Sequence, residues 1–296
     1  MSTVLADRTK RGRSASAPRA RARRALASAL THLLMLALSI VMVVPFISMA
    51  TTSLMTMSQA YSFPPAIWPN PFVWANYPEA LALQPFGRYF MNSTVLAIGV
   101  TAGRVINGAL AAYAFSRLVF PGRDLIFYAY LGTMMIPEHV TLIPLFLILN
   151  AFGWLDSYQG LILPFAVTAF GVFLLRQFFI TIPRELEEAA VIDGCGPFGV
   201  FWRVILPLAK PGLAALAVLS FVSGWNMFVW PLIIANSANM RTIVIGIAQF
   251  QGAYGAITNW PYVMAVSTLA VIPTLGVFFF GQRYFVQGIT LSGLKG

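Results

Sequence analysis

Residues 182–207 read IPRELEEAAVIDGCGPFGVFWRVILP, and the local structure of this polar stretch is the most closely specified in the chain. Pro183 suits the first turn of a helix, where the missing N–H of proline costs nothing. The glutamates Glu185, Glu187 and Glu188 follow at once, where the positive end of a helix dipole stabilises anions. The helix has an apolar side, which is formed by Leu186, Ala189, Ala190 and Ile192. It is then ended by Gly194 and Gly196. The pattern predicts a short amphipathic helix, a sharp turn, and a second helix from Pro197 that enters the next apolar segment.

The sequence around this stretch is strongly apolar. Of the 296 residues, 58% are hydrophobic and 9% are charged, whereas a soluble domain carries about 25% charged residues. The solvent of this chain must therefore be partly lipid. A membrane-spanning helix needs about 20 mostly apolar residues, and six segments qualify, at about 28–54, 89–115, 124–149, 158–180, 211–234 and 262–285. The predicted fold class is an all-α membrane protein with six transmembrane helices.

The positive charges predict the orientation of these helices. Residues 1–27 form a basic tail that we expect to be disordered, and 28–296 form the transmembrane domain. If the tail is inside, the outer loops hold only Arg88 and Arg241. Because cytoplasmic loops carry the excess of Lys and Arg, both termini and the loop at about 181–207 are predicted to be cytoplasmic. The tail then faces anionic lipid and not nucleic acid. A cleaved signal peptide is disfavoured, because its apolar core is usually 7–15 residues long.

Several kinds of chemistry are missing from the sequence. None of the lysines Lys10, Lys210 and Lys295 stands in the Gly-Lys-Ser/Thr ending of a phosphate-binding loop. The chain is therefore predicted not to be an enzyme that hydrolyses ATP. One cysteine and two histidines are too few for a Cys/His metal cluster, so no metal or cofactor is expected. A stand-alone secondary transporter needs only membrane residues, and it stays open as an alternative.

Two charged residues lie near the middle of predicted spans. Arg104 and Glu138 fall at nearly the same depth in the second and third spans, given a rise of about 1.5 Å per residue. Charge inside a membrane usually faces protein or a wet cavity. We expect a buried pair, or a link through one water or a third polar side chain. A tie between helices is the favoured interpretation because unpaired buried charge is costly, and a solute contact or gate is the alternative.

Aromatic residues suggest where a solute could pass. The fifth span contains Trp225, Asn226, Phe228 and Trp230. The apolar C–H faces of sugars stack on aromatic rings, and amides supply hydrogen bonds, so these residues are candidates for the substrate pathway. Helix packing is the competing interpretation. The outer segment 55–88 is rich in Pro and Trp, which suits either a membrane-interface belt or a surface for a partner.

The predicted short helix could seat in a groove of a cytoplasmic partner or lie on lipid. Its sequence resembles the EAA loop of binding-protein-dependent ABC importer permeases: Glu188-Ala189-Ala190, then Gly194, then Leu206-Pro207, at the family's spacing. Val204 stands where the family has Ile. Further stretches are similar to the carbohydrate-uptake branch of that family, and the C-terminus resembles that of the smaller maltose-type permease. These are Asn76-Tyr77, Asn92-Ser93, Ala112-Tyr113-Ala114 with Arg117, Phe120-Pro121-Gly122-Arg123, Trp225-Asn226 and 288–296.

The resemblance implies a type I ABC importer permease in a bacterial or archaeal cytoplasmic membrane. The implied partners are a second homologous permease, two cytoplasmic ATPase subunits that bind the ATP, and an extracytoplasmic solute-binding protein. The implied solute is carbohydrate-like, and the alternative is glycerol-3-phosphate or a related phosphodiester. Met227 replaces the acid that often follows Asn in the family. The residues implied to dock the ATPase are Arg184, Glu187, Glu188, Ala189, Ala190, Asp193, Gly194 and Lys295.

Overall fold

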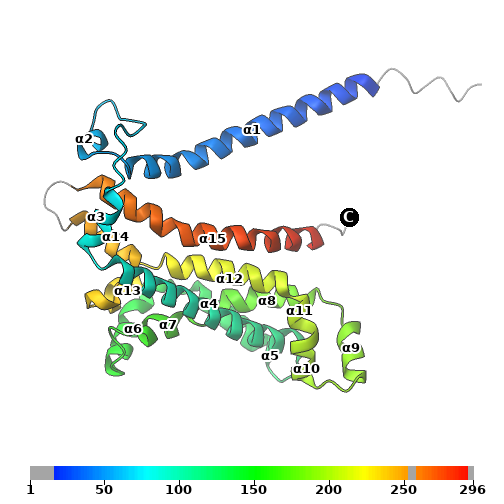
Figure 1. The fold of residues 1–296 in the computed structure, drawn as a ribbon. Helices are drawn as coiled ribbons and strands as arrows, with labels where there is room; N and C mark the ends of the chain where they lie inside the picture. The colour runs from blue at the N-terminus through cyan, green and yellow to red at the C-terminus, as the bar shows by residue number, and fades with distance from the viewer. Residues whose placement is uncertain (1–16, 253–257, 293–296) are drawn as a thin grey trace, which may run out of the picture.

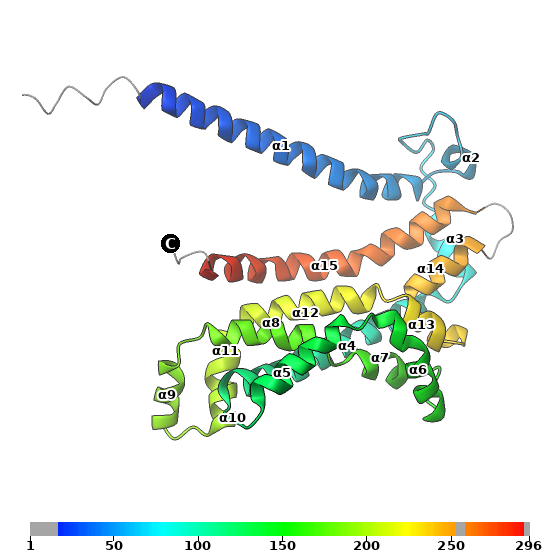
Figure 2. The same ribbon diagram turned by 180° about the vertical axis from the view of Figure 1, so that it is seen from behind.

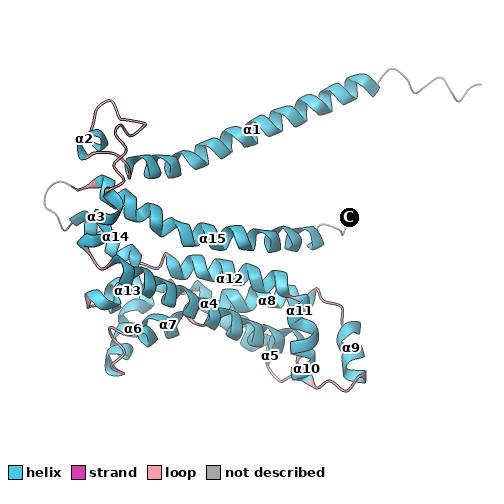
Figure 3. Cartoon of the chain, in the orientation of Figure 1, coloured by secondary structure: helices cyan, strands magenta, loops and turns pink. Residues whose placement is uncertain are grey.

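The computed structural model describes residues 17–252 and 258–292, in which every regular element is a helix (Figures 1 and 3). The long helices are α1 (Ala17–Thr52), α4 (Phe86–Arg117), α12 (Lys210–Trp225) and α15 (Trp260–Ser292). The shorter ones are α2 (Met57–Ala60), α3 (Asn76–Leu83), α5 (Arg123–Gly132), α6 (Glu138–Ala151), α7 (Tyr158–Ile162), α8 (Ala169–Ile180), α9 (Glu185–Ile192), α10 (Pro197–Val200), α11 (Leu206–Leu208), α13 (Val229–Ile234) and α14 (Ile243–Gly252).

The prediction of six transmembrane helices is confirmed. Three single helices in the described residues are long and apolar enough to cross a membrane, at Leu26–Thr52, Phe86–Arg117 and Trp260–Arg283. Three bent helix pairs also qualify: Arg123–Met135 with Glu138–Ala151, Tyr158–Phe165 with Ala169–Ile180, and Pro197–Leu208 with Lys210–Trp225. The fifth span differs from its prediction, because it ends at Trp225, and α13 follows as a separate helix.

Prolines explain where the paired spans bend. The third span turns by 98° between Met135 and Glu138, where Ile136 is extended ahead of Pro137. The helical region is disfavoured for a residue before proline by steric clash. The third pair, which contains the fifth span, turns by 76° at Ala209, between Pro207 and Pro211. Neither proline has an N–H to continue the hydrogen bonding of the helix.

The first helix begins earlier than predicted and stands largely alone. It starts at Ala17, so the expectation that all of residues 1–27 are disordered is wrong for the part from Ala17 onward. Alanine, arginine and leucine favour helix in this segment, and Pro18 is tolerated in the first turn. None (0%) of the apolar span of α1 is buried within the chain, and α1 lies apart from the body over most of its length (Figures 1 and 2).

Helix α4 is the centre of the body and packs on α8, α12 and the segments around α7. Gly103 allows α4 to approach Ala166 closely. A Cβ built there would lie 2.5 Å from the Cβ of Ala166 and 2.9 Å from its Cα. The buried residues of α4 contribute to three apolar clusters, one toward each end of the helix and one along its middle.

Gly103→Ala is expected to lower the stability of the chain, because the new methyl group must displace backbone that is already in contact. Overpacking of this kind typically costs about 1–3 kcal/mol. Gly87→Ala is the matched control, since it lies in the same helix and a Cβ there meets nothing within 4 Å. The midpoint of thermal unfolding in detergent should fall for the first variant and stay or rise for the second. Equal midpoints would show that the contact with Ala166 is not tight.

The two described ends of the chain lie at the same end of the molecule. In Figures 1 and 2 the start of α1, the end of α15, and α9 with α10 are at one end, and α2, α3, α6 and α13 are at the other. This arrangement agrees with an even number of spans and places the loop at about 181–207 on the side of both described ends.

Candidate functional site

The predicted short helix, turn and second helix are present as α9 and α10, and we call residues 183–200 the elbow. Its two helices meet at Gly194, whose φ is +84°. This is a left-handed conformation that glycine adopts without strain and most other residues avoid. The backbone N–H of Cys195 donates to the carbonyl of Ala190 over 2.9 Å and closes the end of α9. The sequence therefore specifies this turn locally.

One face of α9 is turned toward the chain itself. The carboxylate oxygen Oε1 of Glu187 lies 2.6 Å from Nε of Arg117, and the two side chains are 15% and 6% exposed. Neither atom makes an aligned hydrogen bond, so their attraction is Coulombic. Burial raises the pKa of the Glu187 carboxyl above its ordinary value, and the nearby Arg117 guanidinium opposes that rise. Ala190 packs against the apolar cluster around Val200 and Phe201. Glu187 and Ala190 thus make contacts within the chain that the sequence did not indicate, and their role in docking stays a prediction.

The rest of the surface of α9 is exposed. It presents Arg184, Glu188, Ala189, Asp193 and Gly194 from the predicted set. Two apolar side chains that the prediction did not include lie with them: Val191 is 58% exposed and Ile192 is 86% exposed. The side chains of Arg117, Arg184, Glu187, Glu188, Val191 and Ile192 line a hollow of about 400 Å³ here. Exposed branched apolar residues beside a carboxylate and a guanidinium suit a protein partner. Lys295 lies outside the described residues.

The segment after the elbow is irregular before it enters the membrane. Residues 201–205 form a π-helical turn, a feature that is often found at functional sites. The 76° bend at Ala209 follows directly. The second helix of the elbow therefore does not continue straight into the fifth span, as the sequence pattern suggested.

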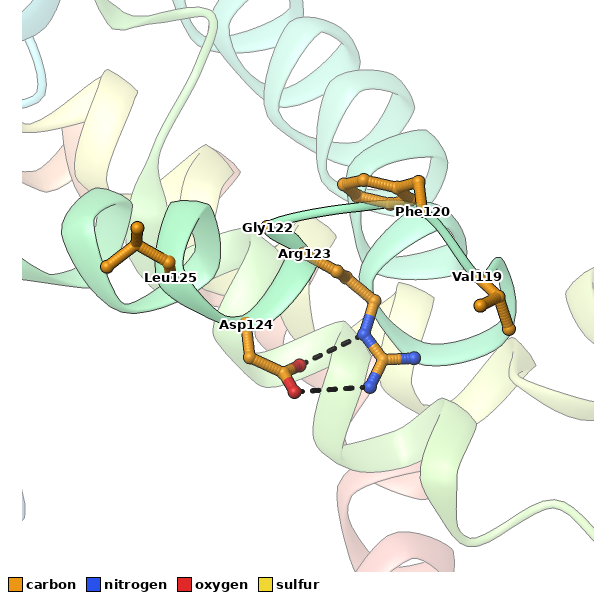
Figure 4. A pocket seen from close by; sticks show the side chains of 6 residues that line it. All are labelled: Val119, Phe120, Gly122, Arg123, Asp124 and Leu125. Atoms are coloured by element: carbon orange, nitrogen blue, oxygen red, sulfur yellow. Dashed lines mark hydrogen bonds and ion pairs between the residues drawn. The ribbon is translucent and has the colours of Figure 1, made fainter.

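A second inner surface lies between α4 and α5. Val119, Phe120, Gly122, Arg123, Asp124 and Leu125 line an open hollow of about 420 Å³ (Figure 4). Nε of Arg123 and Oδ1 of Asp124 are 3.0 Å apart, with the two side chains 28% and 60% exposed. An exposed pair of neighbouring residues contributes little to stability. This hollow therefore has no buried polar group with which to select a ligand.

The two charges within the spans share one cavity but do not touch. Arg104, Glu138, Thr133, Thr141 and Thr168 line a space of about 390 Å³, with apolar residues between them. No ion pair within 4.0 Å joins Arg104 to Glu138 among the described residues, and Glu138 is exposed. Nε of Arg104 instead donates to the carbonyl of Phe165 over 2.9 Å, and Nη1 to Oγ of Ser223 over 3.3 Å. The direct contact expected of the buried pair is therefore absent, and the two groups line the same cavity. The alternative link through one water or a third polar side chain stays a prediction.

The aromatic candidates of the fifth span divide into two groups. Trp225 is 2% and Trp230 is 1% exposed, and their indole N–H groups donate to the carbonyls of Ala270 and Gly160. Both tryptophans are satisfied core residues, so their assignment to the substrate pathway is corrected in favour of helix packing. Asn226 is exposed and Phe228 is 36% exposed. With Ser223, these two residues remain on the open surface.

Sequence reasoning missed a polar cluster at the outer end of α4. Asn92 is fully buried, and its Nδ2 donates to the carbonyls of Asn239 and Arg241, each over 2.8 Å. Its Oδ1 accepts from the hydroxyl of Tyr158 over 2.7 Å. Ser93 accepts from the backbone N–H of Ile243 over 2.9 Å. These contacts hold the outer loop after α13, and the signal for them was an Asn-Ser pair within an apolar run.

The sequence is similar to known membrane transport proteins. Residues 104–291 match the family described as "Binding-protein-dependent transport system inner membrane component". The sn-glycerol-3-phosphate transport system permease protein UgpE of Yersinia enterocolitica is 40% identical over 241 residues, which cover 79% of this chain and 86% of that protein. The protein of the same name from Brucella suis is 36% identical over 277 residues, which cover 90% of this chain and 97% of that one.

The fold is also found in a solved transporter. A chain of a bacterial ABC transporter "involved in the import of the acidic polysaccharide alginate" superposes with a TM-score of 0.79 at 23% identity, covering 88% of this chain and 96% of that one. A chain of the bacterial alginate ABC transporter in complex with a periplasmic protein bound to alginate pentasaccharide gives a TM-score of 0.63 at 15% identity, with 88% and 95% coverage. These likenesses establish the arrangement of the helices.

Proposed function

Because this chain belongs to the family of binding-protein-dependent transport system inner membrane components, we propose that it forms half of the solute pathway of its importer and couples that half to an ATPase through the elbow. The chain itself is a permease of the cytoplasmic membrane. The proposed complex contains a second homologous permease, two ATPase subunits and an extracytoplasmic solute-binding protein. The chain contributes no catalytic group, and the ATPase subunits bind the ATP.

The observation that carries this proposal is the two-sided character of α9. Glu187 anchors the helix to the chain through the buried ion pair with Arg117. The side chains of Glu188, Val191 and Ile192 are exposed, and Glu188 forms no ion pair within the part of the chain that the structure describes. An amphipathic helix that only lay on lipid would not need a buried ionic anchor. A helix that transmits the movement of a partner needs both an exposed surface that binds the partner and a firm contact with the rest of its own chain.

The proposed complex is expected to import solute only when it is complete. In proteoliposomes, ATP-driven uptake should require this chain, its partner permease, the ATPases and the binding protein together. Omitting the ATPases should reduce uptake to the background level, because this chain has no phosphate-binding loop. Gradient-driven uptake by this chain alone would contradict the proposal and favour a secondary transporter.

We propose a carbohydrate-class solute, and the exposed Asn226 and Phe228 support it. An amide with a partly exposed ring suits the hydroxyl groups and the C–H faces of a sugar. A second candidate is an anionic polyol or sugar derivative, and the Arg104 cavity favours it. The guanidinium of Arg104 donates hydrogen bonds to the carbonyl of Phe165 and the hydroxyl of Ser223. Three threonines also line this cavity. The relatives are named for sn-glycerol 3-phosphate.

The two candidates differ in their response to Arg104→Gln. For an anionic solute such as sn-glycerol 3-phosphate, uptake should fall by about tenfold or more, because an ionic hydrogen bond worth about 1.5–3 kcal/mol is lost. For a neutral sugar such as maltose, the change should be much smaller. Measuring uptake of both radiolabelled solutes by the native and variant complexes separates the candidates.

A further inference from the structure

The inner end of α4 holds both arms of the elbow. Arg117, the last residue of α4, pairs with Glu187 of α9 at 2.6 Å. Its Nη2 donates to the carbonyls of Phe179 and Ile182, over 2.6 and 2.7 Å, where α8 ends. One turn earlier, the hydroxyl of Tyr113 donates to the carbonyl of Pro197, the first residue of α10, over 3.0 Å. The last turn of α4 therefore joins the end of α8 and both helices of the elbow.

This junction is buried and well packed. The Arg117 and Glu187 side chains are 6% and 15% exposed, and the rings of Tyr113 and Phe201 lie 5.0 Å apart. Apolar residues of α4, α8 and the elbow surround them in one cluster. Breaking one partner of a buried ion pair is strongly destabilising, because the other charge is left uncompensated. The elbow is thus mounted rigidly on α4.

The route along the chain from the elbow into the following span is less direct. It passes through the π-helical turn at 201–205 and the 76° bend at Ala209. Helix α4, in contrast, is one helix of 32 residues that runs from the junction past Arg104 to the outer end. A displacement of α9 should therefore be transmitted more directly to α4, through the Arg117–Glu187 contact, than to the fifth span through residues 201–209.

We propose that Arg117 and Glu187 are positioning residues that relay movement of the elbow to α4, and through α4 to the Arg104 cavity. The inference rests on the proposed function, because the ATPase is what moves the elbow. It adds that the ATPase moves α4, and not only the span that follows the elbow.

Three variants separate a relay from a purely structural contact: Arg117→Gln, Glu187→Gln and the two combined. Each single variant leaves one buried charge unpaired and should lower stability. The double variant leaves neither charge unpaired, so its level in the membrane and its binding of the ATPases should recover. If the pair is a relay, transmission to α4 stays lost in the double variant. The matched control is Glu185→Gln with Arg123→Gln, because Glu185 is exposed and the contacts of Arg123, with Asp124 and the carbonyl of Leu118, are at the surface.

Transmission can be read from a cysteine on α4 without knowledge of the solute. Cys195 is the only cysteine in the sequence, so Cys195→Ser gives a clean background for Asn107→Cys, an exposed position one turn from Arg104. The rate of modification by a water-soluble maleimide is measured on the whole complex in nanodiscs, with and without Mg-ATP and orthovanadate. In the otherwise native chain and in the control, nucleotide should change this rate by at least about fivefold, the lower range of allosteric couplings.

In the double variant, the change should fall below about twofold while the ATPases stay bound. The inference is overturned if the double variant responds like the control, if its response recovers together with its stability, or if nucleotide has no effect in the native chain with the ATPases bound. It is also overturned if the double variant no longer binds the ATPases, because the pair would then serve docking. Failure of the native chain to bind any ATPase would instead refute the proposed function.

Discussion

Ile192→Arg is expected to weaken the binding of the ATPase to this chain by about 100-fold, or about 2.7 kcal/mol, the size of an interface hot spot. Ile192 is 86% exposed at the end of α9, beside the hollow that Glu188 and Val191 also line. In a docked complex this side chain would be buried, and an arginine there would place an unpaired charge in the interface. The measurement is a titration of purified ATPase against the permease pair in nanodiscs.

Val119→Arg is the control for this prediction. Val119 is 95% exposed on the inner loop between α4 and α5 (Figure 4). It undergoes the same change from a branched apolar residue to arginine. Neither substitution removes a core contact, so both variants should unfold at the temperature of the native chain. If both weaken the ATPase equally, or neither does, the exposed face of α9 is not the specific docking surface.

Asn92→Leu is expected to lower the free energy of unfolding by about 3 kcal/mol. Leucine fills a similar volume but cannot bond the carbonyl of Arg241 or accept from Tyr158, and each buried group left unsatisfied costs about 1–3 kcal/mol. The outer loop after α13 should also become more sensitive to protease, because Asn92 holds two of its carbonyls. Thermal unfolding in detergent and limited proteolysis check the two effects.

Asn107→Leu is the comparison, since Asn107 is an amide in the same helix but is exposed. Its Nδ2 bonds the carbonyl of Gly103 within α4 and that of Ala166 over 3.3 Å. Substitutions at such surfaces usually change stability by no more than about 0.5 kcal/mol. A loss for Asn107→Leu as large as that for Asn92→Leu would mean that burial does not determine the effect.

The features that the sequence predicted correctly have local causes. Pro183, the early glutamates and Gly194 specify the elbow through capping, helix dipole and backbone conformation, which act within a few residues. The spans follow from length and hydropathy. The angles of the bent pairs could not be predicted, because a proline marks where a helix breaks and the packing of its neighbours determines how far it turns.

The errors at the site concern which face of a helix is buried. Trp225 and Trp230 have the right chemistry for a sugar, but their indole N–H groups bond carbonyls on other helices, and only the tertiary arrangement shows this. The Arg117–Glu187 pair was missed for the same reason. Both residues stood in recognised motifs, but their spacing along the chain does not indicate the distance between them in the fold. Helical rise predicted that Arg104 and Glu138 lie near one another, and both side chains line one cavity.

The isolation of α1 has a consequence for how this protein can diverge between species. None (0%) of its apolar span is buried in the chain, compared with 33% for α4. Exchanging one aliphatic side chain for another on α1 opens no cavity within this polypeptide, so the chain's own folding selects there only for length and hydrophobicity. Genetic drift should therefore alter α1 faster than α4. Any position on α1 that resists drift would mark where a neighbouring subunit touches it.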